Sequence, residues 1–141
     1  MFLAAIDYAQ PRHTRAKGER VTKKRETEPF LPLTPAMFQI LVALADGEKH
    51  GYAILKDVAR RTADKVRLSA GTLYGNLSRL ESAGLIAESA RRPELVLDDE
   101  RRRYYLLTEF GRAVAVAEAE RMEEALVQAR AKKLFRKAKL A

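Results

Sequence analysis

The amino-acid sequence predicts a mainly α fold with a small β-wing and one long C-terminal helix. Apolar residues recur at helical spacing in three short segments between residues 33 and 84. Two short segments rich in apolar and aromatic residues follow on either side of a charged loop, which is typical of paired strands. No proline or glycine interrupts the chain from residue 112 onward, so a long final helix can form. A chain of 141 residues fits one small domain.

The first 30 residues are expected to be a flexible basic arm. Residues 11–28 are rich in charge and poor in apolar side chains, so they cannot offset the entropy of ordering. Two alternatives stay open, namely a true start further along the chain and, less favoured, a mitochondrial-type presequence. A folded domain is then expected over residues 31–107, and a long helix with a basic tail over residues 108–141.

Two helices are expected at the start of the domain. Thr34 is a good N-cap, and Pro35 suits the first helical position because its missing N–H is not needed there. Gly47 supplies a C-terminal stop for this helix. The second helix is expected over residues 50–62, where Gly51 permits close approach of a neighbouring backbone.

A third helix is expected over residues 69–82. Ser69 is placed to cap it and Gly84 to close it. Its apolar stripe consists of Leu73, Leu77 and Leu80. Its exposed face is expected to carry Thr72, Asn76 and Arg79.

Short strands at residues 85–87 and 103–107, joined by a basic loop, form a wing after the third helix. Three helices followed by a wing make a winged helix-turn-helix module. Its third helix fits the B-DNA major groove, which is about 12 Å wide. The expected DNA contacts are hydroxyl, amide and guanidinium side chains of this helix and the wing: Ser69, Thr72, Tyr74, Asn76, Arg79, Arg91, Arg92, Arg101, Arg102 and Arg103.

The last helix is expected to begin after the cap residue Thr108 and to continue to about Phe135. Such a helix is longer than the core of one small domain can cover. Small and medium residues alternate at spacings of four and three, which predicts a homodimer seam of Ala115, Ala119, Met122, Leu126 and Ala129. A second apolar line, Phe110, Val114 and Ala117, faces the wing domain, and Glu118, Glu120, Glu123 and Glu124 flank the seam.

Composition narrows the function classes. The formal net charge of +8 makes a polyanion, and nucleic acid first, the leading partner, with a basic surface kept for solubility as the alternative. The chain has no cysteine and only two histidines, so neither a metal centre nor a cofactor is expected. No catalytic motif and no membrane-spanning run is present, which predicts a cytoplasmic protein that is not an enzyme.

Several motifs resemble the PadR family of transcriptional regulators. They are HGY at residues 50–52, GTLY at 71–74, RLESAGLI at 79–86 and RRYYLLT at 102–108. The resemblance covers residues 33–135 and implies a winged-helix homodimer that binds a palindromic operator as a repressor. The single C-terminal helix resembles the short subfamily, in which that helix forms the dimer interface. Gly75 and Asn76 depart from the bulkier or basic residues common after GTLY.

Control by a ligand is a further hypothesis. An apolar pocket between the final and first helices, near Met37, Val114 and Met122, would bind a small apolar effector that relieves repression. The chain has no tryptophan, so the stacking platform of some PadR relatives has no counterpart here. The alternative function is a nucleoid-type protein that binds DNA without sequence preference or ligand response.

Overall fold

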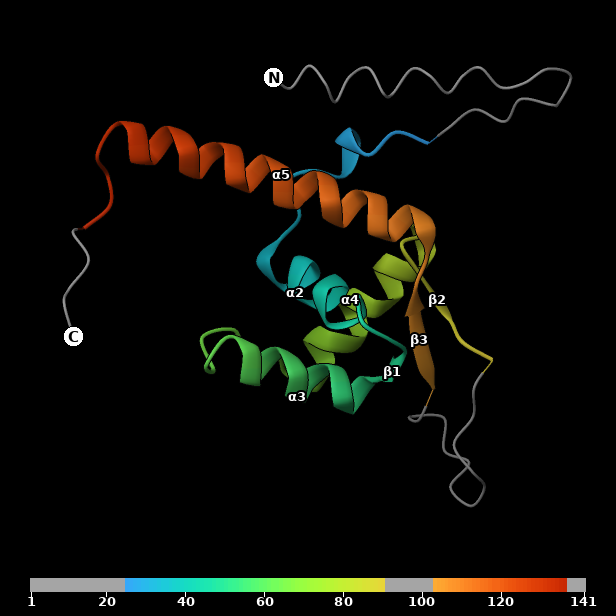
Figure 1. The fold of residues 1–141 in the computed structure, drawn as a ribbon. Coiled ribbons are helices and arrows are strands. Elements are labelled where there is room, and N and C mark those ends of the chain that lie inside the picture. Colours follow the sequence, from blue (N-terminus) through green and yellow to red (C-terminus); the bar gives the residue numbers. More distant parts are fainter. Residues whose placement is uncertain (1–24, 91–102, 137–141) are drawn as a thin grey trace, which may run out of the picture.

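A computed structural model describes residues 25–90 and 103–136 (Figure 1). The mainly α fold with a small β element is confirmed. The elements are the 3-10 helix η2 (Glu28–Phe30), α2 (Pro35–Ala43), β1 (Lys49–His50), α3 (Gly51–Arg61), α4 (Ala70–Ser82), β2 (Ile86–Glu88), β3 (Tyr104–Leu107) and α5 (Glu109–Ala131). We call α2, α3, α4 and the sheet the head.

The sheet has three strands in the order β1-β3-β2, one more than predicted. Both pairs are antiparallel, with Lys49 opposite Tyr105 and Ile86 opposite Leu107. The sequence did not predict β1 because two residues are too few to display the alternation of a strand. This extra strand places the start of α3 beside β3.

The predicted helix starts are confirmed by four capping side chains. Thr34, Ser69 and Thr108 each accept a hydrogen bond from the backbone N–H three residues later. His50 caps α3 in the same way, since its Nδ1 accepts from the Ala53 N–H at 3.2 Å. These bonds satisfy donors that a helix N-terminus otherwise leaves without partners.

The end of α5 corrects the predicted boundary at Phe135. The helix stops at Ala131 because Lys133 takes a left-handed conformation with φ of 60°. The Leu134 N–H then donates to the Ala129 carbonyl at 2.9 Å, which satisfies an orphan acceptor of the last turn. A hydrogen bond of the same kind ends α4. There Gly84 has φ of 82°, and the Leu85 N–H donates to the Leu80 carbonyl. Glycine is a visible stop signal in a sequence, whereas lysine is not.

The core joins all three helices of the head to the sheet and to α5. Its fully buried side chains include Ile40, Leu41, Leu44, Ile54, Val58, Leu73, Leu77, Leu80, Leu85, Ile86 and Val114. The predicted stripe of α4 is therefore confirmed as core. Val114 brings the first turns of α5 into this same core.

Residues 25–30 correct the predicted extent of the arm. The Phe30 ring lies 5.4 Å from the Phe110 ring in an edge-on arrangement. The Arg25 guanidinium carbon lies 4.0 Å from the centre of the same Phe110 ring. Phe30, two residues beyond the charge-rich segment 11–28, supplies apolar contact by packing its ring against α5. The remainder of the predicted arm, residues 1–24, lies outside the described residues.

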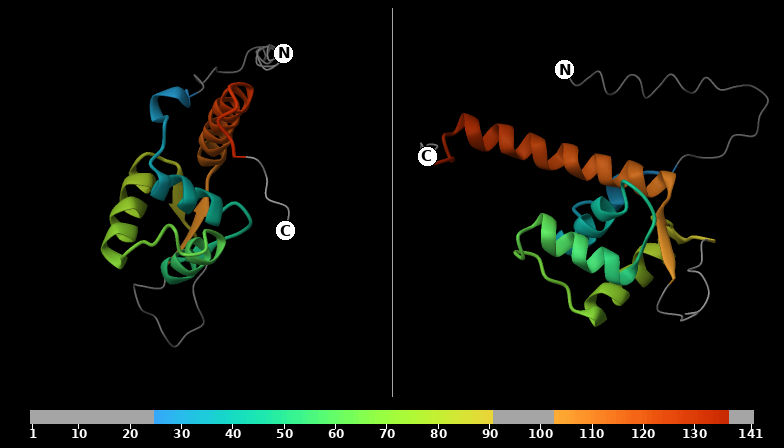
Figure 2. Two further views of the ribbon diagram at one scale, coloured as in Figure 1. Left: turned by 90° about the vertical axis from the view of Figure 1, so that its left-hand side faces the viewer. Right: turned by 60° about the horizontal axis from the view of Figure 1, so that its bottom comes forward.

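The second half of α5 extends beyond the head (Figure 2). In α5 the buried residues are Gly111, Val114 and Glu118, so contact with the head ends about halfway along the helix. Glu118 was expected to flank the dimer seam, but it is 2% exposed and lies at the junction with the head. We call residues 119–131 the projecting half of α5.

Candidate nucleic-acid interface

The outer face of α4 presents polar side chains from its N-cap to its last turn. Ser69, Thr72 and Arg79 are exposed, and Tyr74 is 37% exposed. The Ser69 hydroxyl caps the helix and donates to the Thr72 hydroxyl at 3.0 Å. Hydroxyl and guanidinium groups bind phosphate oxygens and base edges, so this face has the donors that nucleic-acid recognition needs.

Asn76 is not on the exposed face, contrary to the sequence expectation. It is 5% exposed because it lies on the side of α4 that borders the leucine stripe. Its Nδ2 donates to the Thr72 carbonyl at 3.0 Å, and its Oδ1 accepts from Arg79 Nη2 at 3.2 Å. Asn76 therefore holds the Arg79 side chain and has little surface of its own to offer a ligand.

The Arg79 side chain lies along the helix beside Gly75. A Cβ at Gly75 would lie 4.0 Å from Arg79 Nη1, an ordinary van der Waals distance, so the arginine does not require glycine there. The guanidinium reaches back one turn toward the N-terminal end of α4, as long side chains in helices do. Of the two departures from the family pattern, Gly75 and Asn76, Asn76 is the one that bonds Arg79.

Two exposed side chains of α3 extend this face and were not predicted. Tyr52 is 62% exposed, and Lys56 Nζ lies 5.3 Å from the centre of its ring. A Cβ at Gly51 would lie 2.9 Å from Cζ of Tyr74, so the close neighbour of Gly51 is a ring and not the expected backbone. The HGY motif at residues 50–52 contains both Gly51 and Tyr52, so the sequence signal for this end of α3 was present.

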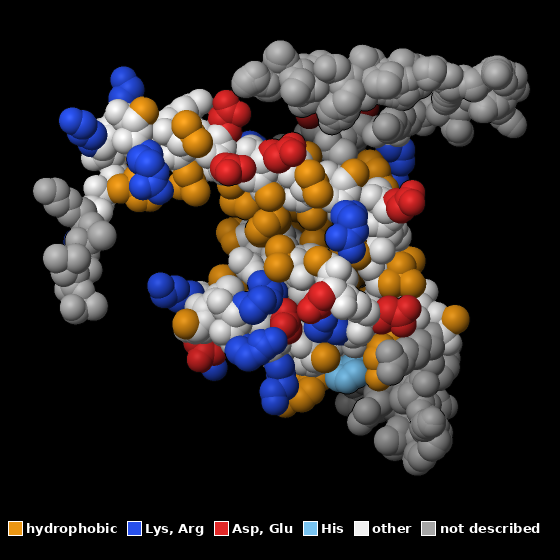
Figure 3. All heavy atoms as spheres, viewed as in Figure 1, with side chains coloured by type: hydrophobic (Ala, Val, Ile, Leu, Met, Phe, Trp, Pro, Cys, Tyr) orange, Lys and Arg blue, Asp and Glu red, His pale blue; other side chains and the backbone are white. Residues whose placement is uncertain are grey.

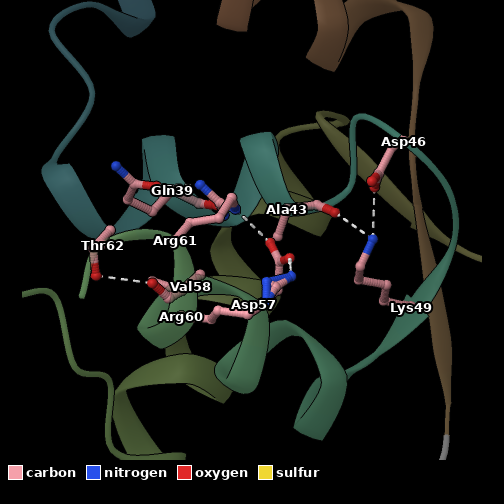
Figure 4. A network of polar contacts seen from close by, with 9 residues as sticks. All are labelled: Gln39, Ala43, Asp46, Lys49, Asp57, Val58, Arg60, Arg61 and Thr62. Carbon is pink, nitrogen blue, oxygen red and sulfur yellow. Dashed lines mark hydrogen bonds and ion pairs between the residues drawn. The ribbon is translucent and has the colours of Figure 1, made fainter. Parts of the chain in front are cut away.

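A polar network fixes the far end of α3 to α2 (Figure 4). Asp57 accepts from Arg60 and Arg61, each at 2.6 Å. Arg61 also donates to the side chain and the carbonyl of Gln39 on α2, at 2.8 and 3.2 Å. Lys and Arg side chains gather over the part of the surface where α3 lies (Figure 3). The Asp57 carboxylate neutralises part of this positive charge and holds the side chains of Arg60 and Arg61 in place.

Of the predicted wing arginines, the structure describes only Arg103. Its side chain is 46% exposed, and its Nε lies 3.7 Å from Oε2 of Glu88 on the neighbouring strand. Such an exposed pair contributes little to stability. The other predicted contacts of the wing, Arg91, Arg92, Arg101 and Arg102, lie outside the described residues.

The predicted seam of α5 differs along its length. Ala115 packs against the core of the head, whereas Ala119 is exposed and Leu126 is 52% exposed. Met122 and Ala129 are half-buried. An open groove lies along the projecting half, lined by Glu123, Leu126, Val127, Arg130 and Ala131. This half of α5 carries apolar side chains that the described residues of the head do not cover.

The residues of the predicted effector pocket differ in exposure, and the pocket stays a prediction. Val114 has 0% exposed surface, so no space that water could enter lies against it. Met37 is half-buried and packs against the same core. The buried Val114 side chain holds α5 to the head. This explains why an apolar residue recurs at this position of the helical pattern.

Two features typical of other classes of protein, a metal-binding cluster and a membrane-spanning helix, are absent from the described residues. Across residues 25–90 and 103–136, no group of three or more His, Cys, Asp or Glu side chains is arranged to hold a metal ion. Within these same ranges, no helix is both long and apolar enough to cross a membrane.

Comparison with known proteins gives consistent matches. The model of the transcriptional regulator PadR-like family matches residues 40–117. The transcriptional regulator Rv3488 of Mycobacterium tuberculosis is 38% identical over 85 residues, which cover 60% of this chain and 73% of that protein.

Solved structures resemble the fold. A transcriptional regulator from Clostridium thermocellum, 24% identical, superposes with a TM-score of 0.57 over 82% of this chain and 100% of its own, and at that identity supports the fold alone. A PadR family transcription regulator from Clostridium difficile is 25% identical, with a TM-score of 0.53 over 70% of this chain and 96% of its own.

Proposed function

Since the chain belongs to the PadR-like family of transcriptional regulators, and is a regulator rather than an enzyme, we propose that it is a homodimeric repressor of a palindromic operator. Each head reads one half-site with the outer face of α4, and the wing contacts the DNA backbone beside it. The protein works in the cytoplasm, where a regulator of this kind meets its DNA. Bound at an operator, the dimer blocks access to the promoter.

The exposed face of α4 is the observation that carries this proposal. Ser69, Thr72 and Arg79 are polar and accessible, while the opposite face of the helix is anchored in the core by leucines. A rigid helix can therefore present donors to a groove of matching width. The net charge of +8 supports binding to a polyanion, and Tyr52 and Lys56 extend the polar face onto α3.

The projecting half of α5 supports the homodimer. A helix of 23 residues is about 34 Å long, and the head buries residues only in its first half. Leu126 and Val127 are 52% and 61% exposed, and exposed apolar side chains on a projecting helix favour a second helix as partner. A second copy of α5 would cover these side chains in both chains at once, as a two-fold axis requires.

Binding measured at two salt concentrations tests the proposal. Fluorescence anisotropy would compare a duplex from upstream of the protein's own gene with a scrambled duplex of equal composition. The proposal expects the upstream duplex to bind at least about a thousandfold more tightly, with a gap that persists at higher salt. Equal affinities that fall steeply with salt would instead favour the nucleoid-type function, in which charge alone binds DNA.

A further inference from the structure

Glu118 is the last buried residue of α5 before the helix leaves the head. Its side chain is 2% exposed, and among the described residues of α5 no later one is buried. Carboxylates are rarely buried in proteins, because removal from water costs more than an ordinary contact returns. Its position on the helix therefore calls for a reason other than packing.

The carboxylate joins two elements that are far apart in the sequence. Arg121 donates to it through two nitrogens, at 2.8 and 2.9 Å, in a bidentate pair. The Leu33 backbone N–H donates to Oε2 at 3.3 Å. Leu33 directly precedes Thr34, the residue that caps α2. The bond therefore runs from the middle of α5 to the start of the first helix of the head.

The bidentate pair keeps the carboxylate charged. The arginine beside it holds the pKa of Glu118 below its usual value, although burial alone would raise it. A buried ion pair adds little net stability when the cost of desolvation is counted. Its charge-assisted hydrogen bonds are short and directional, so they constrain geometry more than they stabilise.

The other end of the junction is a close backbone contact. A Cβ at Gly111 would collide with the Leu85 carbonyl, so the first turn of α5 rests directly on the residue before β2. Gly111 is thus a pivot, and Glu118, about 10 Å further along the helix, decides the direction in which α5 leaves the head.

The lever formed by α5 amplifies movement at Glu118. Ala131 is about 30 Å from Gly111 along the helix, or roughly three times as far as Glu118. A shift of about 1 Å at Glu118 would move the end of α5 by about 3 Å. One base-pair step of B-DNA is about 3.4 Å, so this movement within one protomer is comparable to one base-pair step, and a two-fold dimer adds the same movement in its second head.

We propose that the Glu118 carboxylate, held by Arg121 and bonded to the Leu33 N–H, is a positioning residue that sets the half-site spacing the dimer accepts. With 2% of its surface exposed, it acts through the geometry of its own chain. It fixes the angle between the dimerisation helix and the head, and the two heads then meet the DNA at one separation. This inference rests on the proposed function, since it requires a dimer whose heads read two half-sites.

The test compares three variants of the full-length protein with the wild type. Glu118→Gln removes the charge and keeps an acceptor for the Leu33 N–H. Arg121→Gln removes the charge of the partner at a side chain that is 45% exposed, and the glutamine amide can still donate to the Glu118 carboxylate, so this variant changes the pair without altering the buried residue. Glu120→Gln is the matched control, because it removes an exposed carboxylate from the same helix. Sedimentation checks that each protein is a dimer.

The probes are duplexes built from the half-sites that footprinting defines for the wild type. The spacer is kept at its natural length or changed by one or two base pairs in either direction. We expect the wild type and Glu120→Gln to prefer the natural spacer by about tenfold or more. We expect this preference to fall below about threefold in Glu118→Gln and Arg121→Gln, with little change in affinity for the best spacer.

The outcomes separate the two hypotheses. Dimeric Glu118→Gln and Arg121→Gln that keep the full spacer preference of the wild type would overturn the positioning role and leave the proposed function intact. Weaker binding that is uniform over all spacers would also overturn it, because a purely structural role lowers affinity without changing spacing. A wild type that is monomeric, or that protects no paired half-sites, would instead refute the proposed function.

Discussion

The polar side chains of α4 have different roles, which depend on the face of the helix from which each one projects. Ser69 and Thr72 are exposed at its first turn, where N–H groups and hydroxyls can face DNA together. Asn76 lies on the inner side and bonds Arg79, so its amide acts through the arginine. A residue type suited to reading adenine is thus used here to orient a residue type suited to reading guanine.

The coupling between Asn76 and Arg79 can be measured with a double-mutant cycle. Arg79→Ala is expected to weaken binding to the operator by about 1–3 kcal/mol. Asn76→Ala is expected to lose part of the same energy, because a free arginine must be ordered on binding. The two losses should overlap by about 0.5–1.5 kcal/mol when the changes are combined. Strictly additive losses in operator affinity would show that Asn76 does not orient Arg79.

A larger residue at Gly51 should displace the Tyr74 ring. The ring of Tyr74 occupies the space that a Cβ would need, so Gly51→Ala is expected to destabilise the protein by about 1–3 kcal/mol in urea denaturation. Combination with Tyr74→Ala should remove most of this cost. Gly71→Ala is the control, because no atom lies within 4 Å of a Cβ at that helical position. A harmless Gly51→Ala would refute the contact.

The ion pair of Glu118 gives stability a defined dependence on pH. Arg121 holds the pKa of Glu118 below its usual value, so the folded protein binds this proton less readily than the unfolded chain. The resulting stabilisation is complete above the unfolded pKa, about 4.3, and is lost as pH falls through the folded pKa.

Thermal unfolding of Glu118→Gln tests that dependence. At pH 7 the variant should melt about 5 °C below the wild type, and the difference should shrink as pH falls below about 4.3. Glu120→Gln, which removes an exposed carboxylate, controls for the loss of one negative charge. A difference for Glu118→Gln that is constant from pH 7 to pH 3 would contradict a charged Glu118.

At the scale of elements, α5 combines two roles along one helix. Its first half belongs to the core of the head through Gly111 and Val114, and its projecting half bears exposed apolar residues. The cap at Thr108 marks the start of α5, and packing against the head continues beyond it to Glu118. The head and the first half of α5 therefore share one core.

The projecting half of α5 is the place to test the dimer. Leu126→Glu puts a charge into the expected interface and should yield monomers in sedimentation velocity at micromolar concentration, without loss of helix content. Gln128→Glu is the matched control, since it adds the same charge to an exposed position two residues away. A Leu126→Glu protein that still sediments as a dimer would place the interface elsewhere.

Helix starts could be predicted from the sequence where a capping side chain marks them. Thr34, Ser69 and Thr108 were identified as caps because a hydroxyl before an apolar stripe has that single local use. The strand β1 was missed because its pairing depends on β3, more than fifty residues away in the sequence. The end of α5 was missed because Lys133 adopts a positive φ that lysine does not signal.

For the whole molecule, helical periodicity and turn residues were sufficient to predict the head and the long helix. The site was less predictable, because exposure depends on which neighbour covers each face. Periodicity alone assigned Asn76 and Glu118 to the surface, while both are buried by elements that the sequence does not bring next to them. The DNA roles of Ser69, Thr72, Tyr74 and Arg79 stay predictions, as do those of the wing arginines.

Selection from a random duplex library tests the central claim most directly, because it does not presuppose where the operator lies. We expect the full-length protein to enrich a palindrome whose half-sites lie about 34 Å apart or a multiple of that distance, as two heads on one face of the DNA require. Arg79→Ala should relax the selected sequence within each half-site. Recovery of unrelated sequences with no shared half-site would contradict a sequence-reading dimer.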